Sequence, residues 1–163
     1  MKKFDVRIVE LSHESLSQVM DVQAASYLPN YQEERSCFQT MLEVFPEGCF
    51  GAFAGDIIAG YLFCHPYFLH QPKPLNFALT LTHTENCLYI HDLNISPKFR
   101  GQRIAKLLVK HAFQLRESKG YPSIALISVQ NSEKFWENQG FTSLSTINYG
   151  AQKSVYMVRS FPD

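Results

Sequence analysis

The stretch I-S-P-K-F-R-G-Q-R-I-A-K-L-L, residues 95–108, carries most of the information about the fold. It joins the end of an apolar run, residues 87–95, to a helical pattern over residues 101–119 through a short basic turn. Gly120 ends that helical pattern. A buried strand that runs directly into a long helix is typical of an α/β fold. Residues at helical spacing predict the core-facing side of the helix: Ile104, Leu107, Leu108, His111 and Leu115.

The segments on either side supply the remaining elements. Before this stretch we expect a helix capped by Ser12 or Ser15, a second helix at residues 33–44, and strands at residues 6–11, 49–54 and 57–65. Gly55-Asp56 suits the tight turn of a hairpin. Residues 66–82 contain three prolines and predict a long irregular loop. After the stretch we expect a strand at 124–129, a short helix at 132–139, and a terminal hairpin of strands 141–147 and 155–161.

The order of these elements predicts a mixed α/β (α+β) fold. Hairpins alternate with a strand–helix–strand crossover, which is right-handed in nearly all proteins. We therefore expect a six- to seven-stranded, mostly antiparallel sheet with helices on both faces. At 163 residues the chain fits a single domain, residues 1–163.

Charge and hydropathy exclude several classes of function. Lys plus Arg equals Asp plus Glu at 15 each, so no overall field favours nucleic acid or an anionic membrane as partner. Asp5 interrupts the N-terminus before an apolar signal core forms, and no window approaches a membrane span. We therefore expect a cytoplasmic protein. The cysteines show no C-x-x-C pairing and predict buried, reduced thiols: Cys37, Cys49, Cys64 and Cys87.

One string of residues resembles a metal-ligand pattern. His83, Cys87 and His91 are spaced four apart, which on a helix places them on one face. The surrounding residues favour a strand, and four residues of strand cover about 13 Å, too far for neighbours in this set to share one zinc ion. We therefore expect no metal site.

The basic turn after residue 95 is a candidate anion site. The first N–H groups of a helix have no partner within the helix, and the positive end of the helix dipole lies behind them. Arg100 and Arg103 add positive charge, and Gly101 lets the backbone approach an anion closely. We call residues 100–106 the phosphate cradle. Taken alone, a basic helix start is equally compatible with a solvated first turn.

The cradle resembles the acetyl-CoA-binding motif of the GNAT superfamily, [QR]-x-x-G-x-[GA]. Arg100, Ile104 and Ala105 fit this pattern, and Arg103 replaces its glycine. Residues 131–141, N-S-E-K-F-W-E-N-Q-G-F, resemble a second GNAT element that follows at the expected distance. The resemblance implies acetyl-CoA as co-substrate, a sheet splayed between strands 4 and 5, and a pantetheine arm paired with the backbone of Leu93, Asn94 and Ile95. The implied coenzyme-binding residues also include Arg100, Gly101, Gln102, Arg103, Ile104, Ala105, Lys106, Asn131 and Trp136.

Residues 47–66 and the run L-Y-I-H-D-L-N-I look like the arylalkylamine N-acetyltransferase branch of this superfamily. Those enzymes carry two histidines two residues apart, and the equivalent positions here are Tyr89 and His91, on one face of the strand. An amine must lose a proton before it attacks, and His91 suits that role by its ordinary pKa. Without the resemblance, such a histidine is more often a hydrogen-bonded core residue.

The resemblance implies direct attack of the amine, without an acyl-enzyme. The tyrosine that protonates the coenzyme A thiolate in this superfamily is Trp136 here, and an indole cannot serve as an acid. Tyr149 or Tyr156 replaces it, the thiolate leaves into water, or the domain binds coenzyme A and catalyses poorly. Aromatic residues near the acceptor side suit an aryl- or alkylamine, or are ordinary packing: Tyr27, Tyr31, Tyr67 and Phe68.

Three functions fit the sequence. The first is acetyl transfer to the primary amine of a small aryl- or alkylamine, which the long loop favours because it covers a pocket. The second is a protein or peptide N-acetyltransferase, which needs an open groove. The third is a non-catalytic acyl-CoA-binding regulatory domain, suggested by Arg103 and Trp136. The terminal hairpin is a candidate surface for a homodimer.

Overall fold

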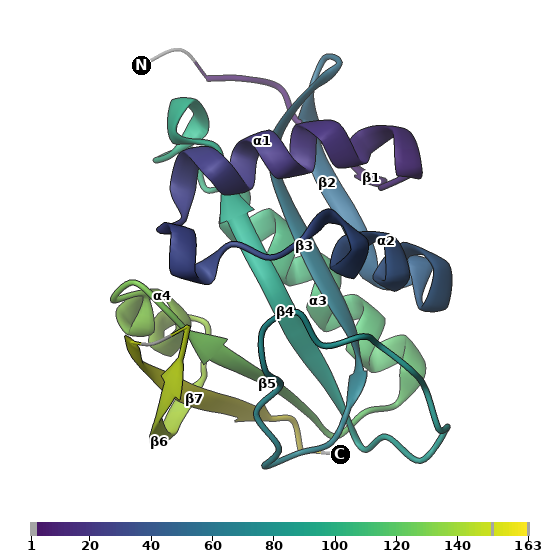
Figure 1. Cartoon of the computed structure of the whole chain (residues 1–163), viewed down its shortest axis with the longest axis vertical. Helices are drawn as coiled ribbons and strands as arrows, with labels where there is room; N and C mark the ends of the chain where they lie inside the picture. The colour runs from purple at the N-terminus through teal and green to yellow at the C-terminus, as the bar shows by residue number, and fades with distance from the viewer. Residues whose placement is uncertain (1–2, 151, 163) are drawn as a thin grey trace.

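A computed structural model describes residues 3–150 and 152–162, and one seven-stranded sheet forms the centre of this part (Figure 1). The strands are β1 (Arg7–Glu10), β2 (Cys49–Ala54), β3 (Ile57–Tyr67), β4 (Cys87–Ile95), β5 (Ser123–Ser128), β6 (Thr142–Tyr149) and β7 (Gln152–Ser160). The helices are α1 (Leu16–Ser26), α2 (Arg35–Val44), α3 (Ile104–Lys119) and α4 (Glu133–Asn138).

The strands are ordered β1-β2-β3-β4-β5-β7-β6. Every neighbouring pair is antiparallel except β4 and β5, which are parallel and joined through α3. Parallel neighbours need a crossover connection, and the long helix after the basic turn provides it. The mixed, mostly antiparallel sheet confirms the predicted fold class.

Helices cover both faces of the sheet. In Figure 1, α1 and α2 lie in front of the central strands and α3 lies behind them. On the front, Phe38 of α2 packs against Phe63, with ring centroids 4.8 Å apart. On the back, α3 buries Leu108, Val109 and Ala112 in the same core. Within the described residues, none of the helices combines the length and the apolar character needed to cross a membrane.

The face that α3 turns toward the sheet differs from the prediction. Leu107 is 42% exposed, and His111 is exposed as well. Val109 and Ala112 are buried instead, beside the correctly predicted Ile104 and Leu108, and Leu115 packs against the core as predicted. The helix also begins at Ile104 rather than at residue 101, because Gly101 and Arg103 take non-helical, positive φ values. The periodicity therefore predicted three of the five core-facing residues and misplaced Leu107 and His111.

The ends of several other helices and strands differ from the prediction by a few residues. α2 begins at Arg35 rather than at residue 33, and β6 continues to Tyr149 beyond the predicted 147. β3 continues through Pro66 to Tyr67, although proline lacks the N–H that a central strand donates. Its pairing with β2 stops at Phe63, so Pro66 has β4 on one side and an unpaired edge on the other. The predicted loop therefore starts two residues later than residue 66.

The sheet opens between β4 and β5. Only Leu88, Tyr89 and Ile90 of β4 pair with β5, opposite residues 124–126. From His91 onward β4 continues for five residues without a β5 partner. The predicted splay between the fourth and fifth strands is therefore present, and it leaves an opening at the end of the strand that leads into the phosphate cradle.

Candidate active site

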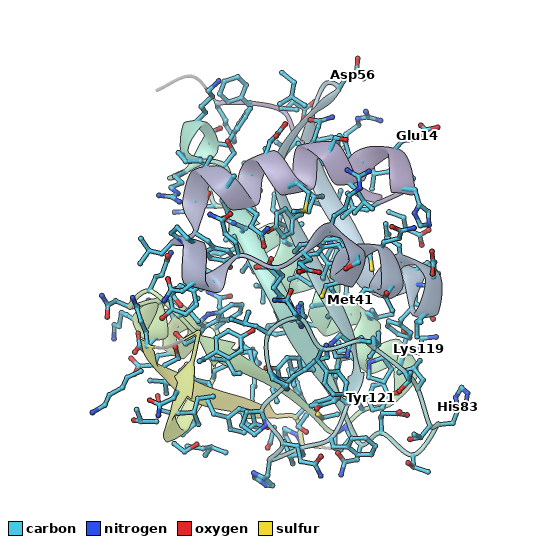
Figure 2. The ribbon with its side chains drawn as sticks, in the orientation of Figure 1. Glu14, Met41, Asp56, His83, Lys119 and Tyr121 are labelled. Atoms are coloured by element: carbon cyan, nitrogen blue, oxygen red, sulfur yellow. The ribbon has the colours of Figure 1, made fainter. Side chains whose placement is uncertain are left out.

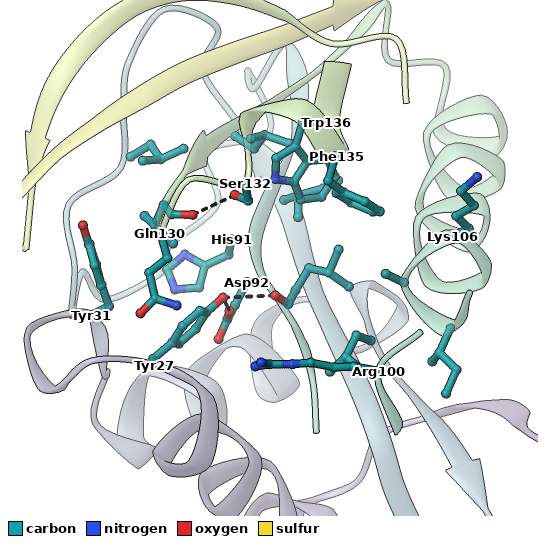
Figure 3. Close-up of a pocket in the computed structure, with 18 of the residues that line it drawn as sticks. Tyr27, Tyr31, His91, Asp92, Arg100, Lys106, Gln130, Ser132, Phe135 and Trp136 are labelled. Carbon is teal, nitrogen blue, oxygen red and sulfur yellow. Dashed lines mark hydrogen bonds between the residues drawn. The ribbon is translucent and has the colours of Figure 1, made fainter. Parts of the chain in front are cut away.

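A cavity of about 580 Å³ occupies the splay between β4 and β5 (Figure 3). Its walls come from the loop after α1, the second half of β4, the phosphate cradle, β5, α4 and the end of β6. Segments far apart in the sequence thus meet around one space. The two ends of this cavity differ in chemistry.

The first end is the phosphate cradle, which is cationic. Arg100, Arg103 and Lys106 all line the cavity, and in Figure 3 Arg100 extends from the turn into it. The residue before α3, Arg103, makes no side-chain capping hydrogen bond, so no side-chain oxygen competes for the first helical N–H groups. Gln102 also lines the cavity, while its side-chain oxygen accepts a hydrogen bond from the backbone of Phe4.

The backbone of the cradle is unusual in two places. Gly101 and Arg103 have φ values of 78° and 62°, in the left-handed region. A turn of this kind aims successive main-chain N–H groups to one side and makes an anion-binding concavity. Free helical N–H groups, left-handed turn residues and three cations form a donor set suited to a pyrophosphate.

The second end of the cavity is acidic and aromatic. His91 Nε2 lies 2.5 Å from Glu33 Oε1, and both side chains are nearly buried, at 1% and 4% exposure. The other carboxylate oxygen of Glu33 accepts a hydrogen bond from the backbone N–H of Asn76, at 2.9 Å. Burial alone raises the pKa of Glu33, but the His91 charge and these hydrogen bonds outweigh it, so the pKa is lowered. Glu33 is therefore a carboxylate that accepts from Nε2–H of His91.

Asp92, the next residue of β4, is a second buried acid. The hydroxyl of Tyr27 lies 2.6 Å from its Oδ1, and the hydroxyl of Tyr61 donates to Oδ2 at 2.8 Å. Burial raises the pKa of Asp92 to about 6, although both hydrogen bonds favour the carboxylate. Figure 3 shows Tyr27 beside Asp92 in the cavity wall. Its hydroxyl is also 3.0 Å from the carbonyl of Leu93, on the splayed part of the strand.

Three segments close over the acidic end. The ring of Tyr31, after α1, stacks on Tyr149 of β6 with centroids 6.3 Å apart. Its hydroxyl donates to the side chain of Gln152 at 2.9 Å, across the hairpin. A Cβ added to Gly150 would meet the side chain of Leu75 at 3.2 Å, so the long loop reaches the same place. Tyr31, Leu75 and Tyr149 all line the cavity.

Comparison with known proteins identifies this arrangement. Residues 15–141 match the model of the acetyltransferase (GNAT) family. The chain belongs to the GNAT family. It is therefore an acyltransferase, and acetyl-CoA is its donor substrate. None of the curated proteins with which the chain was compared matches it.

Solved structures with the same fold support the assignment. The PaiA N-acetyltransferase of Thermoplasma acidophilum, solved with coenzyme A, has a TM-score of 0.73 at 18% identity, over 96% of this chain and 99% of that one. Arabidopsis thaliana Naa50, solved with a bisubstrate analogue, has a TM-score of 0.75 at 18% identity, over 96% and 99%. The loading GNATL domain of CurA from Lyngbya majuscula reaches 0.81 at 13% identity, over 96% and 98%. At these identities the likeness shows the fold alone.

The GNAT cavity is lined by twelve of the catalytic and coenzyme-binding residues that the sequence suggested. Those that line it are His91, Tyr149, Leu93, Ile95, Arg100, Gly101, Gln102, Arg103, Ile104, Ala105, Lys106 and Trp136. Tyr89, Asn94, Asn131 and Tyr156 lie outside its lining, as do Tyr67 and Phe68 among the suggested acceptor-side aromatic residues. Tyr89 is buried beneath this lining, in a cluster with Cys87 and Tyr156. Asn94 is buried against Tyr61, with its amide nitrogen 3.5 Å from that hydroxyl. Asn131 is exposed and lies outside the lining.

Sequence reasoning missed Glu33 and Asp92. Asp92 offered a signal, because an acid between His91 and Leu93 interrupts an otherwise apolar strand. Glu33 offered none, since it stands in a polar stretch before α2 and meets His91 only through the fold, 58 positions along the chain. Tyr27, named among the aromatic residues, holds Asp92 rather than only packing.

The cysteines and the groups that could bind a metal ion also bear on the chemistry of this cavity. All four cysteines are free and buried, as predicted. Burial raises the pKa of the Cys87 thiol to about 12 and that of Cys64 well above its ordinary value, so neither is a ready thiolate. Among residues 3–150 and 152–162, no group of three or more His, Cys, Asp or Glu side chains is placed to hold a metal ion.

Proposed function

We propose that this GNAT enzyme transfers the acetyl group of acetyl-CoA to the primary amine of a small aryl- or alkylamine, by direct attack. One observation carries the proposal: the cavity has a cationic end at the cradle and an acidic, aromatic end at Glu33 and Asp92. A polyphosphate suits the first end and an ammonium beside an apolar group suits the second. The thioester lies between them, where β4 and β5 part. The splayed backbone of residues 93–95 is the proposed partner of the pantetheine arm.

His91 and Glu33 supply the means to remove a proton from the amine. A primary alkylamine is mostly protonated at neutral pH and must become neutral before it attacks the thioester. His91 lines the cavity, and the carboxylate of Glu33 orients its ring and stabilises an imidazolium. The carboxylates of the acidic end, Glu33 and Asp92, attract the cationic form of the acceptor. This division of roles needs no nucleophilic cysteine.

Tyr149 is the proposed acid for the departing thiolate, in place of the tyrosine that Trp136 replaces. It lines the cavity, and burial together with the nearby charge of Glu33 raises its pKa above the ordinary value. The phenol therefore carries its proton at neutral pH. The same raised pKa makes it a weak acid, so its candidacy rests on its place in the cavity wall. Trp136 also lines the cavity, with its ring against Phe141, and contributes an apolar wall.

The closure of the acidic end favours a small acceptor over a peptide. A peptide needs an open groove, whereas Tyr31, Leu75 and Tyr149 meet over this end. Structural relatives include Naa50, solved with an analogue that carries a peptide sequence, so a peptide acceptor is the second candidate.

Thiol release from acetyl-CoA tests the proposal. A panel of aryl-, alkyl- and polyamines, together with short peptides that have free N-termini, is compared for native protein and His91→Gln. We expect the small amines to react fastest and His91→Gln to lower kcat by roughly 100-fold, a normal effect for the loss of a general base. His83→Gln, on the outer side of the long loop, is the matched control (Figure 2).

Three outcomes would overturn parts of the proposal. An unchanged rate in His91→Gln removes His91 from the mechanism. Faster reaction with peptides replaces the small amine as acceptor class. Binding of coenzyme A without thiol release for any acceptor indicates a regulatory acyl-CoA-binding domain.

A further inference from the structure

Two buried imidazole rings lie side by side behind the acidic end of the cavity. His65 of β3 and His91 of β4 have ring centroids 5.7 Å apart and planes 44° apart. His65 is completely buried, and the side chain of His91 is 1% exposed. His65 plays no part in the mechanism described so far, and the sequence did not single it out.

The hydrogen bonds of the two rings fix which nitrogens carry protons. His65 Nδ1 lies 2.8 Å from the carbonyl of Pro66, which only accepts, so Nδ1 carries the hydrogen and Nε2 a lone pair. His91 Nε2 donates to Glu33, so in the neutral ring Nδ1 carries the lone pair. In the described part of the chain, neither His65 Nε2 nor His91 Nδ1 has a hydrogen-bond partner.

Two buried acceptors on adjacent rings are an unfavourable arrangement, because each has lost water without gaining a donor. One proton added to His91 supplies the missing donor. The two unpartnered nitrogens are not in hydrogen-bond contact. With His91 as imidazolium, a small shift of the rings or one bridging water molecule lets Nδ1–H donate to His65 Nε2, while Nε2–H still donates to Glu33. Every nitrogen of the two rings is then satisfied.

We propose that Glu33, His91 and His65 form a row that holds the proton that the acceptor ammonium loses. The inference rests on the proposed acetyl transfer. An ammonium N–H bond breaks, its electron pair stays on the nitrogen for the attack, and the proton is bound by His91. It leaves again to water. After the attack the nitrogen loses a second proton, which replaces the proton that Tyr149 gives to the coenzyme A thiolate. His65 acts through His91 and is a positioning residue.

The surroundings of the row agree with this role. Burial, and then the charge of His91, hold the pKa of His65 well below its ordinary value, so His65 stays neutral and accepts. Glu33 lies against His91, and the buried amine of Lys73 is near enough to help lower the pKa of both Glu33 and His65. The other titratable groups around the row are Tyr67 on β3, Tyr89 and Asp92 on β4, Cys37 on α2 and Tyr149 on β6.

Acceptors of different basicity test the inference. For an alkylamine, which is protonated at neutral pH, we expect His65→Leu to lower kcat by roughly 10- to 100-fold, with an unchanged KM for acetyl-CoA. For an aniline-type amine, which is already neutral, we expect little change. His65→Gln keeps an oxygen that can accept from His91 and should retain more activity than His65→Leu. Equal losses for both amines, or equal activity of the two variants, would overturn the inference.

A spectroscopic measurement separates this inference from the proposed reaction. At one fixed pH near neutrality, ¹⁵N chemical shifts of the His91 ring report the fraction of imidazolium without any acceptor present. We expect that fraction to be lower in His65→Leu and in Glu33→Gln than in native protein and in the His83→Leu control. An unchanged fraction in His65→Leu contradicts the proposal even where thiol release is normal.

Discussion

Asp92 shows how one residue at this site opposes stability. Both of its oxygens accept from tyrosine hydroxyls, yet burial dominates and raises the pKa from 3.8 to about 6. The folded state therefore holds the proton more tightly than the unfolded state does. The resulting stabilisation is complete below about pH 3.8 and is lost as the pH rises through about 6. A buried carboxylate that weakens the fold at neutral pH is typical of a functional position.

Replacing Asp92 by Asn removes this titration. Between pH 5 and 7 we expect the unfolding free energy of the native protein to fall by about 1 kcal/mol relative to that of Asp92→Asn. Glu33, with its lowered pKa, is already a carboxylate over this range and adds little slope in either protein. Urea unfolding at both pH values measures the effect, and Asp56→Asn at the exposed hairpin tip is the control (Figure 2). Parallel pH profiles for native protein and Asp92→Asn would contradict the assignment.

At the residue scale, the sequence predicted which residues line the cavity better than it predicted which side chains contact each other. The cradle residues follow the spacing of a motif, and His91 stands where the resemblance placed one of two histidines; all of them line the cavity. Arg103, which departs from that motif, nevertheless has the left-handed backbone that glycine adopts readily, with φ of 62°. Its side chain adds charge to the cavity without changing the turn. Glu33 and His65 could not be predicted, because what matters about them is a contact made across the fold.

At the scale of elements, the order of strands and helices followed from periodicity. Which side of a helix packs against the sheet did not. β4 was predicted with its observed bounds because a continuous apolar run ends at the turn into the cradle. Part of the core-facing side of α3 was misplaced. Leu107 and His111 fit helical spacing as well as Val109 and Ala112 do, but only the latter two are buried. Which side of the helix meets the sheet depends on the crossover, and no local pattern encodes it.

The end of β4 depends on one close approach by β3. A Cβ added to Gly60 would lie 2.5 Å from Ile95 Cδ1 and 2.8 Å from the carbonyl oxygen of Asn94. We expect Gly60→Ala to displace this splayed end, to lower stability by about 1–3 kcal/mol, and to weaken coenzyme A binding. Urea unfolding and calorimetry with coenzyme A measure the two effects.

A second glycine separates general destabilisation from displacement of β4. Gly55 has φ of 63° and open space around it, so Gly55→Ala strains the backbone at the hairpin tip, far from the cavity. We expect that variant to lose stability and to bind coenzyme A normally. If Gly60→Ala also bound coenzyme A normally, the splayed end of β4 would have no role in holding the pantetheine arm.

At the scale of the whole molecule, the two ends of the cavity are built by different parts of the chain. The cationic end is local, formed by a single turn and the start of α3, so a sequence motif reveals it. The acidic end combines the segments around Tyr31, Leu75 and Tyr149, which lie far apart in the sequence. The cationic end was therefore predictable, whereas the shape of the acidic end required the fold.

The long loop between β3 and β4 should set the size of the acceptor. Leu75 lines the cavity and lies within reach of the hairpin tip at Gly150, so its side chain closes the acidic end. Shortening it in Leu75→Ala adds room without removing any polar group. We expect the ratio of kcat/KM for a bulky amine to that for a small one to rise by about tenfold, since a hydrophobic pocket discriminates by this order per group added or removed.

Leu81→Ala is the matched control, because Leu81 belongs to the same loop but packs against the core and does not line the cavity. Both variants lose apolar contacts, so a general loosening of the loop would change their acceptor ratios equally. A change confined to Leu75→Ala places the acceptor between Leu75 and His91. Equal ratios in the two variants would instead mean that the acceptor binds outside the covered end, and the argument for a small amine would lose its structural basis.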